Sequence, residues 1–381
     1  MENWRRYCAA PEQTLEGNEI ELLRGGEEAF PAMLSAITGA REHVLLEFYS
    51  FADDSAGRSF AELLKKKALE GVSVYLLYDS IGSILTGRRF FLDLAASGVN
   101  VAEFRPVIYW KPYWNWIKRD HRKTVCVDGR WVFVGGFNIT ESDAPRSMGG
   151  RGWQDTQVRV SGPVTAEIER IFWEAWYAST PVAGPHVPGL RVQPAPPAGA
   201  KRALAVFAGG VRNSRSIRRA YRHAIDSASE YIYITNAYFL PDRMVLRRLE
   251  EAARRGVDVR IIGPVETDHP YVRWASWAIF GRLLRSGVKI YEWQGAILHS
   301  KTAVIDGVWS SVGSHNLDHR SLHYNLEVNV NVYDRSFGSA MARAFREDLK
   351  NCRAVSYADV KRRPLTAKAA SKFLYFFRSW L

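Results

Sequence analysis

Two short stretches of the chain carry the same reactive side chains in the same spacing. Each begins with a histidine, has a lysine two positions later and an aspartate five positions further on, and then a glycine-rich segment with an asparagine. The first copy supplies His121, Lys123, Asp128, Gly135, Gly136 and Asn138, and the second supplies His299, Lys301, Asp306, Gly313, Ser314 and Asn316. One such motif is a weak signal, but two in register within a repeated sequence indicate a site.

These residue types suit the chemistry of a phosphodiester. On a strand, residues two apart point to the same face, so each lysine places positive charge beside its histidine and can bind a phosphate. The asparagine amides can donate to phosphate oxygens, and the glycines let the backbone approach closely. If the copies pack together, one imidazole can attack phosphorus and form a phosphohistidine, while the other protonates the leaving alkoxide and then deprotonates the incoming hydroxyl. Such a site needs no metal and no cofactor.

Each imidazole also needs an acceptor that orients its far nitrogen. Asp155 and Glu327 hold matching positions on the strand after each motif, so we expect them to support the histidines; the alternative is two surface acids. Asp128 and Asp306 are included among the candidate catalytic residues. Because both fall at Asp-Gly hairpin turns, where aspartate is also favoured for backbone reasons, a structural role is equally open.

The elements that must hold these residues also occur twice. Each copy predicts a helix end, an apolar strand, an acidic turn, a helix, a glycine and a second strand, over residues 36–79 and 224–264. A further helix and strand, the hairpin of the motif, and a strand followed by an amphipathic helix complete each copy. Because strands and helices alternate, the predicted fold class is α/β: two tandem repeats, each a mixed β-sheet flanked by helices, packed with pseudo-twofold symmetry.

A stretch rich in Pro, Gly and Ala at 181–201 has the composition of a linker. It separates predicted repeats at 1–180 and 202–355, and a basic-aromatic tail follows at 356–381. The three cysteines are few, odd in number and widely spaced, which argues against a disulfide framework or a zinc site and fits a reducing compartment.

The chain is basic, with a formal net charge of +12, which favours either nucleic acid or an acidic lipid surface as partner. It opens on no signal-peptide-like segment, and no run of about 18 apolar residues predicts a transmembrane helix. Aromatic and basic residues interleave at 107–120, at 271–287 and in the tail, as in membrane-interface anchors; burial is the alternative for each. The predicted membrane contacts are Trp110, Trp114, Trp116, Phe376, Phe377 and Trp380.

At these residues the sequence resembles the phospholipase D superfamily, whose hallmark is the duplicated HKD motif. The resemblance runs from about residue 17 to 350 and is closest to bacterial cardiolipin synthases of the short form without transmembrane helices. It rests on NEIELLRGGEEAFPAMLSAI, LLEFYSFADD, HRKTVCVDGRWVFVGGFN and GSHNLDHRSLHYNLEVN. It implies metal-independent transfer of a phosphatidyl group from one phosphatidylglycerol to a hydroxyl of another, through a phosphohistidine, with glycerol leaving.

The resemblance also implies a role for each matching residue. His121 and His299 are the catalytic pair, with His121 as nucleophile; the two motif lysines, Asn138 and Asn316 bind phosphate; Asp155 and Glu327 support the histidines. Ser314 matches a serine common in the family, whereas Gly136 replaces it in the first copy, so we expect hydroxyl contact with phosphate from one side only. The implied partners are an anionic phospholipid, phosphatidylglycerol, and the cytoplasmic face of the cell membrane, with the protein peripheral.

Other functions stay open. A phospholipase D-type hydrolase would use the same catalytic residues with water as acceptor, and would differ in water exclusion and in the pocket for a second alcohol. A nuclease of the superfamily would suit the basic charge, but the clustered tryptophans beside the first motif disfavour nucleic acid. Which alcohol accepts the group does not follow from the sequence. A monomer suffices, because the repeat itself supplies the pseudo-twofold, and an oligomer stays open.

Overall fold

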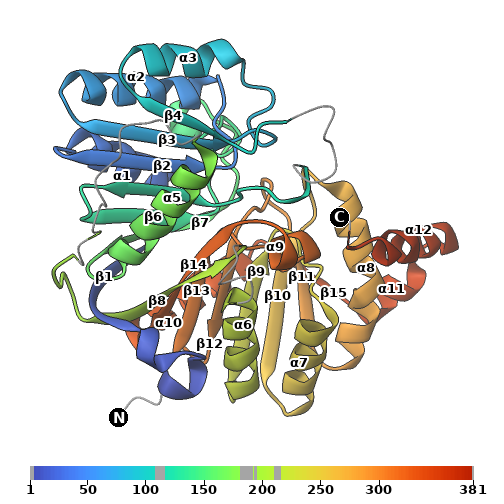
Figure 1. The fold of residues 1–381 in the computed structure, drawn as a ribbon. Helices are drawn as coiled ribbons and strands as arrows, with labels where there is room; N and C mark the ends of the chain where they lie inside the picture. Colours follow the sequence, from blue (N-terminus) through green and yellow to red (C-terminus); the bar gives the residue numbers. More distant parts are fainter. Residues whose placement is uncertain (1–3, 108–115, 181–191, 193–194, 210–215, 380–381) are drawn as a thin grey trace.

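A computed structural model describes residues 4–107, 116–180, 192, 195–209 and 216–379 of the chain (Figure 1). Trp110, Trp114 and Trp380, three of the predicted membrane contacts, lie outside the described residues. The predicted fold class is confirmed: helices and strands alternate in two similar halves that share one mixed sheet.

The first repeat contributes the strand order β4-β3-β2-β5-β6-β7-β1. Its strands β2, β3 and β4 are parallel, and the other pairs are antiparallel. The strands are β1 (Leu15–Arg24), β2 (His43–Phe48), β3 (Ser73–Asp79), β4 (Asn100–Phe104), β5 (Lys123–Val127), β6 (Trp131–Gly135) and β7 (Thr156–Ser161). The helices are α1 (Gly26–Thr38), α2 (Ser55–Leu69), α3 (Arg88–Ala96) and α5 (Thr165–Ser179).

The second repeat gives the matching order β11-β10-β9-β12-β13-β14-β8, and β15 (Cys352–Val355) is added at its outer edge. The strands are β8 (Lys201–Ala208), β9 (Tyr231–Asn236), β10 (Asp258–Pro264), β11 (Lys289–Trp293), β12 (Lys301–Ile305), β13 (Trp309–Gly313) and β14 (Glu327–Tyr333). The helices are α6 (Ser216–Ser227), α7 (Arg243–Arg254), α8 (Pro270–Arg285), α9 (His319–His323), α10 (Arg335–Leu349), α11 (Tyr357–Arg362) and α12 (Leu365–Phe376). A short, irregular pairing of β1 with β8 joins the two halves.

The local signals of the sequence explain both motif hairpins. β5 turns into β6 at Asp128-Gly129, where φ is +52° and +60°, and β12 turns into β13 at Asp306-Gly307, where φ is +51° and +64°. Two successive residues with positive φ form the turn whose twist matches a tight antiparallel hairpin. The hairpins therefore fix the register of β5 and β12, the strands that begin at the motif lysines.

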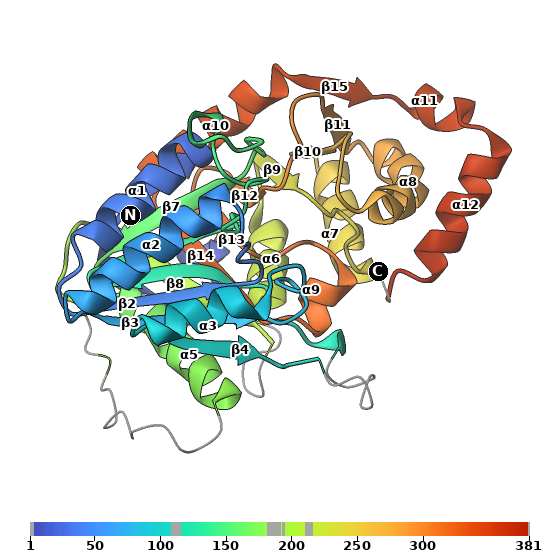
Figure 2. The same cartoon turned by 90° about the horizontal axis from the view of Figure 1, so that it is seen from above.

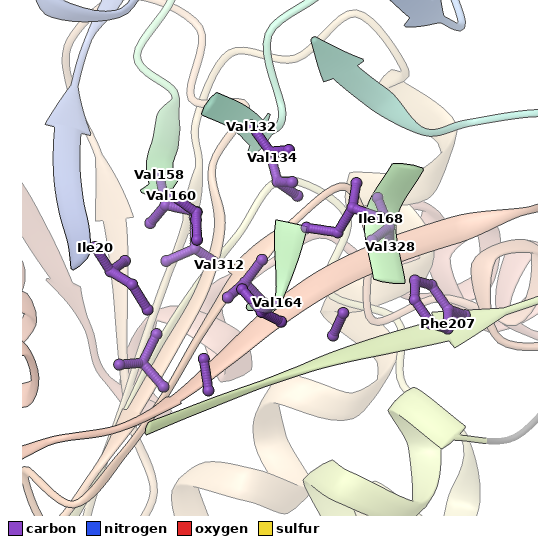
Figure 3. Close-up of a cluster of buried hydrophobic side chains, with 14 of the residues drawn as sticks. Ile20, Val132, Val134, Val158, Val160, Val164, Ile168, Phe207, Val312 and Val328 are labelled. Carbon is purple, nitrogen blue, oxygen red and sulfur yellow. The ribbon is translucent and has the colours of Figure 1, made fainter. Parts of the chain in front are cut away.

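A shared core lies between the two halves. Helices α1, α2 and α3 cover the outer face of the first half, and α6, α7 and α8 cover that of the second (Figures 1 and 2). The inner faces pack on each other together with α5 and α10. Figure 3 shows this cluster, in which Val134 and Val158 of the first repeat lie near Val312 and Val328 of the second. Burying the inner faces makes the two repeats one packing unit.

The first and last described helices both lie on the second repeat. The short 3-10 helix η1 (Trp4–Tyr7) packs on α6, and Tyr7 donates a hydrogen bond to Asp306, so the first residues leave the repeat predicted for 1–180. In the tail, α12 packs along α8 (Figure 2). None of the helices in the described part of the chain is long and apolar enough to cross a membrane.

Candidate active site

Two short backbone bridges between the repeats position the catalytic candidates. Leu326 pairs with Asp120 in the parallel sense, and the His121 amide donates to the Leu326 carbonyl at 3.0 Å. The equivalent bridge pairs Gln154 with Leu298, where the His299 amide donates to the Gln154 carbonyl at 2.8 Å. The first bridge therefore sets His121 of the first repeat beside Glu327, which begins β14 of the second. The second bridge sets His299 of the second repeat beside Asp155, which directly precedes β7 of the first.

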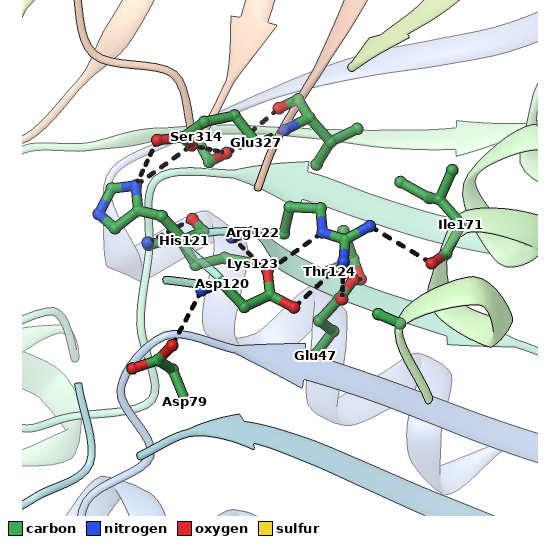
Figure 4. A network of polar contacts seen from close by, with 12 residues as sticks. Glu47, Asp79, Asp120, His121, Arg122, Lys123, Thr124, Ile171, Ser314 and Glu327 are labelled. Atoms are coloured by element: carbon green, nitrogen blue, oxygen red, sulfur yellow. Dashed lines mark hydrogen bonds and ion pairs between the residues drawn. The ribbon is translucent and has the colours of Figure 1, made fainter. Parts of the chain in front are cut away.

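The histidine–carboxylate pairs are consequently crossed between the repeats. His121 Nδ1 lies 3.1 Å and 3.2 Å from the two carboxylate oxygens of Glu327, and His299 Nδ1 lies 2.8 Å from Asp155 Oδ2 (Figure 4 shows the first pair). All four side chains are buried. A carboxylate beside Nδ1 favours the tautomer with the proton on that atom, which leaves Nε2 with a lone pair for chemistry.

The motif lysines lie directly beneath the histidines. Lys123 Nζ donates to the His121 carbonyl at 2.7 Å, and Lys301 Nζ donates to the His299 carbonyl. Lys301 Nζ also lies 3.6 Å from Asp155 Oδ2. Both ammonium groups are fully buried, and burial lowers the pKa of Lys123 to about 7 and the pKa of Lys301 in the same direction.

Both members of the His121–Glu327 pair have shifted pKa values. Burial, followed by the positive charges of Lys123 and Lys301, holds the pKa of His121 well below its ordinary value, so the imidazole is neutral at pH 7. Burial raises the pKa of Glu327 to about 7. A neutral imidazole with its Nδ1 proton engaged is the form required of a nitrogen nucleophile.

One cavity of about 1010 Å³ joins the two repeats. Its wall includes His121 and His299 together with Asn138 and Asn316, whereas the motif lysines are not among its lining residues. Asn138 accepts a hydrogen bond from the Ser50 amide at 3.2 Å, and the Oδ1 atom of Asn316 is buried without a hydrogen-bond partner among the described residues. The structure thus brings both histidines and both asparagines to one space of the size of a ligand pocket.

Ser314, for which the family resemblance implies contact with phosphate, lies outside the cavity wall. Its hydroxyl donates to Glu327 Oε2, and its side chain is fully buried. At the equivalent Gly136, a Cβ atom would lie 2.1 Å from Asp155 Oδ2, so no serine fits there. In the structure the serine steadies the longer carboxylate and the glycine makes room for the shorter one, and hydroxyl contact between Ser314 and phosphate stays a prediction.

The motif aspartates are separated from the histidines by the length of a strand. Asp128 accepts hydrogen bonds from the backbone amides of residues 41, 42 and 43, where β2 begins. Asp306 does the same for residues 229, 230 and 231 at the start of β9. These carboxylates tie each hairpin to the neighbouring strand because they satisfy backbone amides at its start, which is the structural role left open for them; a catalytic role stays a prediction.

The sequence interpretation missed a charged network behind His121. Arg122 contacts Glu47 at 2.6 Å and Asp120 at 3.1 Å, and Asp79 accepts from the Asp120 amide at 2.9 Å (Figure 4). These side chains are buried, and burial raises the pKa of Glu47. The signal in the sequence is a glutamate inside the apolar strand LLEF and the charges that flank the motif histidine in RDHRK. A buried network of this kind fixes the backbone on both sides of His121.

Aromatic rings border both histidines and were also missed. The Tyr49 ring lies edge-on to His121 at 5.0 Å between centroids, and Trp153 and Tyr238 lie at 5.7 Å and 6.2 Å from His299. Tyr49 and Tyr238 follow the apolar strands of the two repeats, which is the only hint that the sequence carries. The rings limit the directions from which a substrate can approach the histidines.

One group of side chains has metal-ligand geometry. Asp143, Asp155 and His299 each offer a ligand atom, and these atoms lie within 4.8 Å of one another. Two of the three already form the buried hydrogen-bonded pair, and the Lys301 ammonium lies against the same Asp155 oxygen. The nearby positive charge disfavours a cation at this position.

Two α/β repeats that bring paired histidines to one cavity define a phospholipase D-like protein. The chain matches the family model described as "Cardiolipin synthase, PLD-like domain" over residues 33–176 and 221–349, and it belongs to this family. It is 34% identical to cardiolipin synthase A of Pseudomonas putida over 345 residues, covering 91% of this chain and 71% of that protein. It is 33% identical to a cardiolipin synthase of Geobacillus kaustophilus over 358 residues, covering 93% and 70%.

Solved structures agree on the fold. The phosphatidylserine synthase of Haemophilus influenzae superposes with a TM-score of 0.77 at 12% identity over 100% of both chains. A polyphosphate kinase of Porphyromonas gingivalis superposes with a TM-score of 0.57 at 14% identity, over 95% of this chain and 56% of the kinase. At these identities the likeness shows the fold alone.

Proposed function

We propose that this protein is a phosphatidyltransferase that joins two phosphatidylglycerol molecules into cardiolipin and releases glycerol. The relatives at about one-third identity are named cardiolipin synthases, and they align with nine-tenths of the chain. The single observation that carries the proposal is the crossed arrangement of His121–Glu327 and His299–Asp155 at one cavity. Two oriented imidazoles at one space are what a two-step displacement at phosphorus requires.

In the first step, His121 Nε2 attacks the phosphorus of one phosphatidylglycerol. A phosphorus–nitrogen bond forms, the phosphorus–oxygen bond to glycerol breaks, and protonated His299 gives its proton to the departing oxygen. The carboxylate of Glu327 stabilises the positive charge that develops on the His121 ring. Lys123 and Lys301, with Asn138 and Asn316, are the proposed phosphate ligands.

In the second step, the headgroup of another phosphatidylglycerol replaces glycerol. Neutral His299 removes the proton from its hydroxyl, the oxygen bonds to phosphorus, and the bond to His121 breaks. The enzyme returns to its starting protonation state, and every proton is accounted for. Water in place of the second alcohol would give phosphatidic acid, so exclusion of water separates transfer from hydrolysis.

We further propose that the protein acts as a peripheral protein at the cytoplasmic face of the cell membrane. Trp116 lines the cavity and is 45% exposed, and the tail carries Phe376 and Phe377 at 75% and 39% exposure. Leu85, which the sequence interpretation did not single out, also lines the cavity and is 99% exposed. Apolar side chains held in water at the mouth of a cavity are typical of a membrane contact.

The direct test incubates purified protein with phosphatidylglycerol vesicles and separates the lipids by chromatography. Cardiolipin with an equivalent of glycerol supports transfer, phosphatidic acid alone indicates a hydrolase, and plasmid cleavage without lipid turnover indicates a nuclease. His121→Ala and His299→Ala should each abolish turnover while vesicle binding persists. Near-normal turnover by either variant would contradict the two-histidine scheme.

A further inference from the structure

We infer that the end of the cavity beside His299 is a subsite for a hydroxylated headgroup, built from Tyr238, Asp268, His269 and Tyr271. The inference rests on the proposed function and adds to it which wall of the cavity recognises the alcohol. It comes from a comparison of two loops that hold equivalent places in the two repeats but differ in chemistry.

The loops follow β3 and β10, strands that each lie between two parallel neighbours in their own repeat. Residues 80–87 connect β3 to α3, and residues 265–269 connect β10 to α8. Both loops line the same cavity, one on the side of each repeat. Because pseudo-twofold symmetry makes their positions equivalent, a difference in their side chains points to a difference in what each end binds.

The loop of the first repeat presents hydrocarbon from a rigid support. Asp79 accepts from the amides of Ile81 and Gly82 at 2.9 Å and 3.1 Å, and the Thr86 hydroxyl donates to the backbone carbonyl of residue 51 at 2.8 Å. At the tip, Ile84 and Leu85 are 62% and 99% exposed. A loop anchored at both ends that keeps two aliphatic side chains in water fits the hydrocarbon part of a lipid.

The loop of the second repeat contributes Asp268 and His269 to a chain of hydrogen-bonding groups that Tyr238, after β9, and Tyr271, in α8, complete. The Tyr238 hydroxyl donates to Asp268 Oδ1 at 2.6 Å, His269 Nε2 lies 3.7 Å from Asp268 Oδ2, and the Tyr271 hydroxyl lies 3.1 Å from His269 Nδ1. The chain begins beside His299, since the Tyr238 ring lies 6.2 Å from its imidazole.

Asp268 is the acceptor at the centre of this chain. Its side chain is 30% exposed at the cavity wall. Burial raises the pKa of this carboxyl, but the charge of His299 and the Tyr238 hydroxyl outweigh burial and lower it, so Asp268 is ionised. An ionised carboxylate with free lone pairs beside tyrosine and histidine can accept from the neighbouring hydroxyls of a diol, whereas it gains nothing from an acyl chain.

The placement agrees with the order of the two steps. His299 protonates the alcohol that leaves and deprotonates the alcohol that enters, so both alcohols must reach phosphorus from its side of the cavity. The leaving glycerol and the glycerol headgroup of the second lipid both carry hydroxyls beyond the reacting oxygen. One polyol subsite beside His299 therefore serves both steps, and the apolar loop near the other end receives the acyl chains.

The experiment measures how the phosphohistidine divides between two acceptors. Purified protein turns over phosphatidylglycerol vesicles in the presence of ethanol, and the ratio of cardiolipin to phosphatidylethanol is measured. Ethanol has no second hydroxyl, so only cardiolipin formation uses the subsite in the second step. Both products arise from one intermediate, so the ratio is independent of how much active protein each variant contains.

We expect Asp268→Ala to lower the ratio on the order of tenfold, the usual effect of losing hydrogen bonds to a charged group, and Tyr271→Phe to lower it less. Glu266→Gln, which changes an exposed acid of the same loop outside the cavity wall, is the matched control and should leave the ratio unchanged. Asp268→Asn keeps the shape of the side chain, so the ratio is measured on this variant if the alanine variant does not fold.

A ratio within twofold of the wild type in the Asp268 and Tyr271 variants would overturn the subsite. Wild-type protein that forms neither product would instead overturn the proposed function. The two failures are therefore distinguishable in one assay.

Discussion

The crossing of the histidine–carboxylate pairs makes a specific prediction about Glu327. In the serine-protease triad, replacing the orienting carboxylate by its amide lowers kcat by about 10⁴. Here the His121–Glu327 contacts are 3.1 Å and 3.2 Å, and a pKa of about 7 leaves roughly half of the carboxyl charged at pH 7. The charge lost in Glu327→Gln is thus smaller, and we expect kcat to fall by roughly 10² to 10³.

The assay uses a phosphatidyl ester of p-nitrophenol, whose leaving group needs no proton. Glu327→Gln should lose the burst of p-nitrophenolate, because its carboxylate supports the attacking His121. Asp155→Asn should keep a burst of one equivalent and then stall, because His299 is needed only to activate the next acceptor.

Asp128→Asn is the control for these two variants. It should lower Tm through the loss of a carboxylate that accepts from backbone amides, but leave the burst intact. A burst retained by Glu327→Gln and lost by Asp155→Asn would assign the attack to His299 instead. Normal turnover in both would refute the role of the crossed pairs.

Three further outcomes follow from the geometry. Gly136→Ser should abolish activity and lower Tm, because its Cβ would lie 2.1 Å from Asp155 Oδ2; retention of both properties would contradict the close approach. The pKa of Glu327 is raised by folding from 4.5 to about 7, so its contribution to stability is present below pH 4.5 and is lost as pH rises through 7. The side chain introduced by Glu327→Gln does not titrate. Denaturant unfolding should therefore show that the stability of this variant, relative to wild type, rises by up to about 3 kcal/mol between pH 4.5 and 8. A stability difference that does not change with pH would contradict the argument from burial. Leu85→Ser should weaken sedimentation with anionic vesicles, whereas Leu69→Ser, at an 81% exposed leucine outside the cavity wall, should not; equal effects would remove the loop from the membrane contact.

Much of the fold could be predicted because its signals are local. The Asp-Gly turns, the glycines after helices and the alternation of apolar strands with amphipathic helices each act over a few residues, and they occur twice. The order of strands in each half follows from the same repetition. The packing of residues 4–7 on α6 was not predictable, because it depends on a contact between segments about 200 residues apart with no pattern of their own.

The sequence predicts which residues belong to the candidate site but not which of their side chains contact one another. The sequence indicates both histidines and both supporting carboxylates, yet His121 and Glu327 are 206 residues apart, and only the bridge between residues 120 and 326 decides which carboxylate meets which histidine. The same holds for Ser314, whose partner is chosen by the packing of β13 on β14. Side-chain partners across an interface depend on register, which no single segment encodes.

The duplicated fold supplies two similar histidine sites, whereas the proposed reaction needs two unlike ones. The difference arises from a few side chains at equivalent positions. A glycine lets the short carboxylate of Asp155 lie 2.8 Å from His299, while the longer Glu327 is steadied by Ser314 and stays at 3.1 Å or more from His121. Burial of the ring, followed by the positive charges of Lys123 and Lys301, lowers the pKa of His121 and keeps the ring neutral, as the proposed nucleophile must be. The loops at the two ends of the cavity also differ: one is apolar and the other, beside His299, carries hydrogen-bonding groups. The hydrogen-bonding end is therefore on the side of the histidine that is proposed to exchange protons with the alcohols.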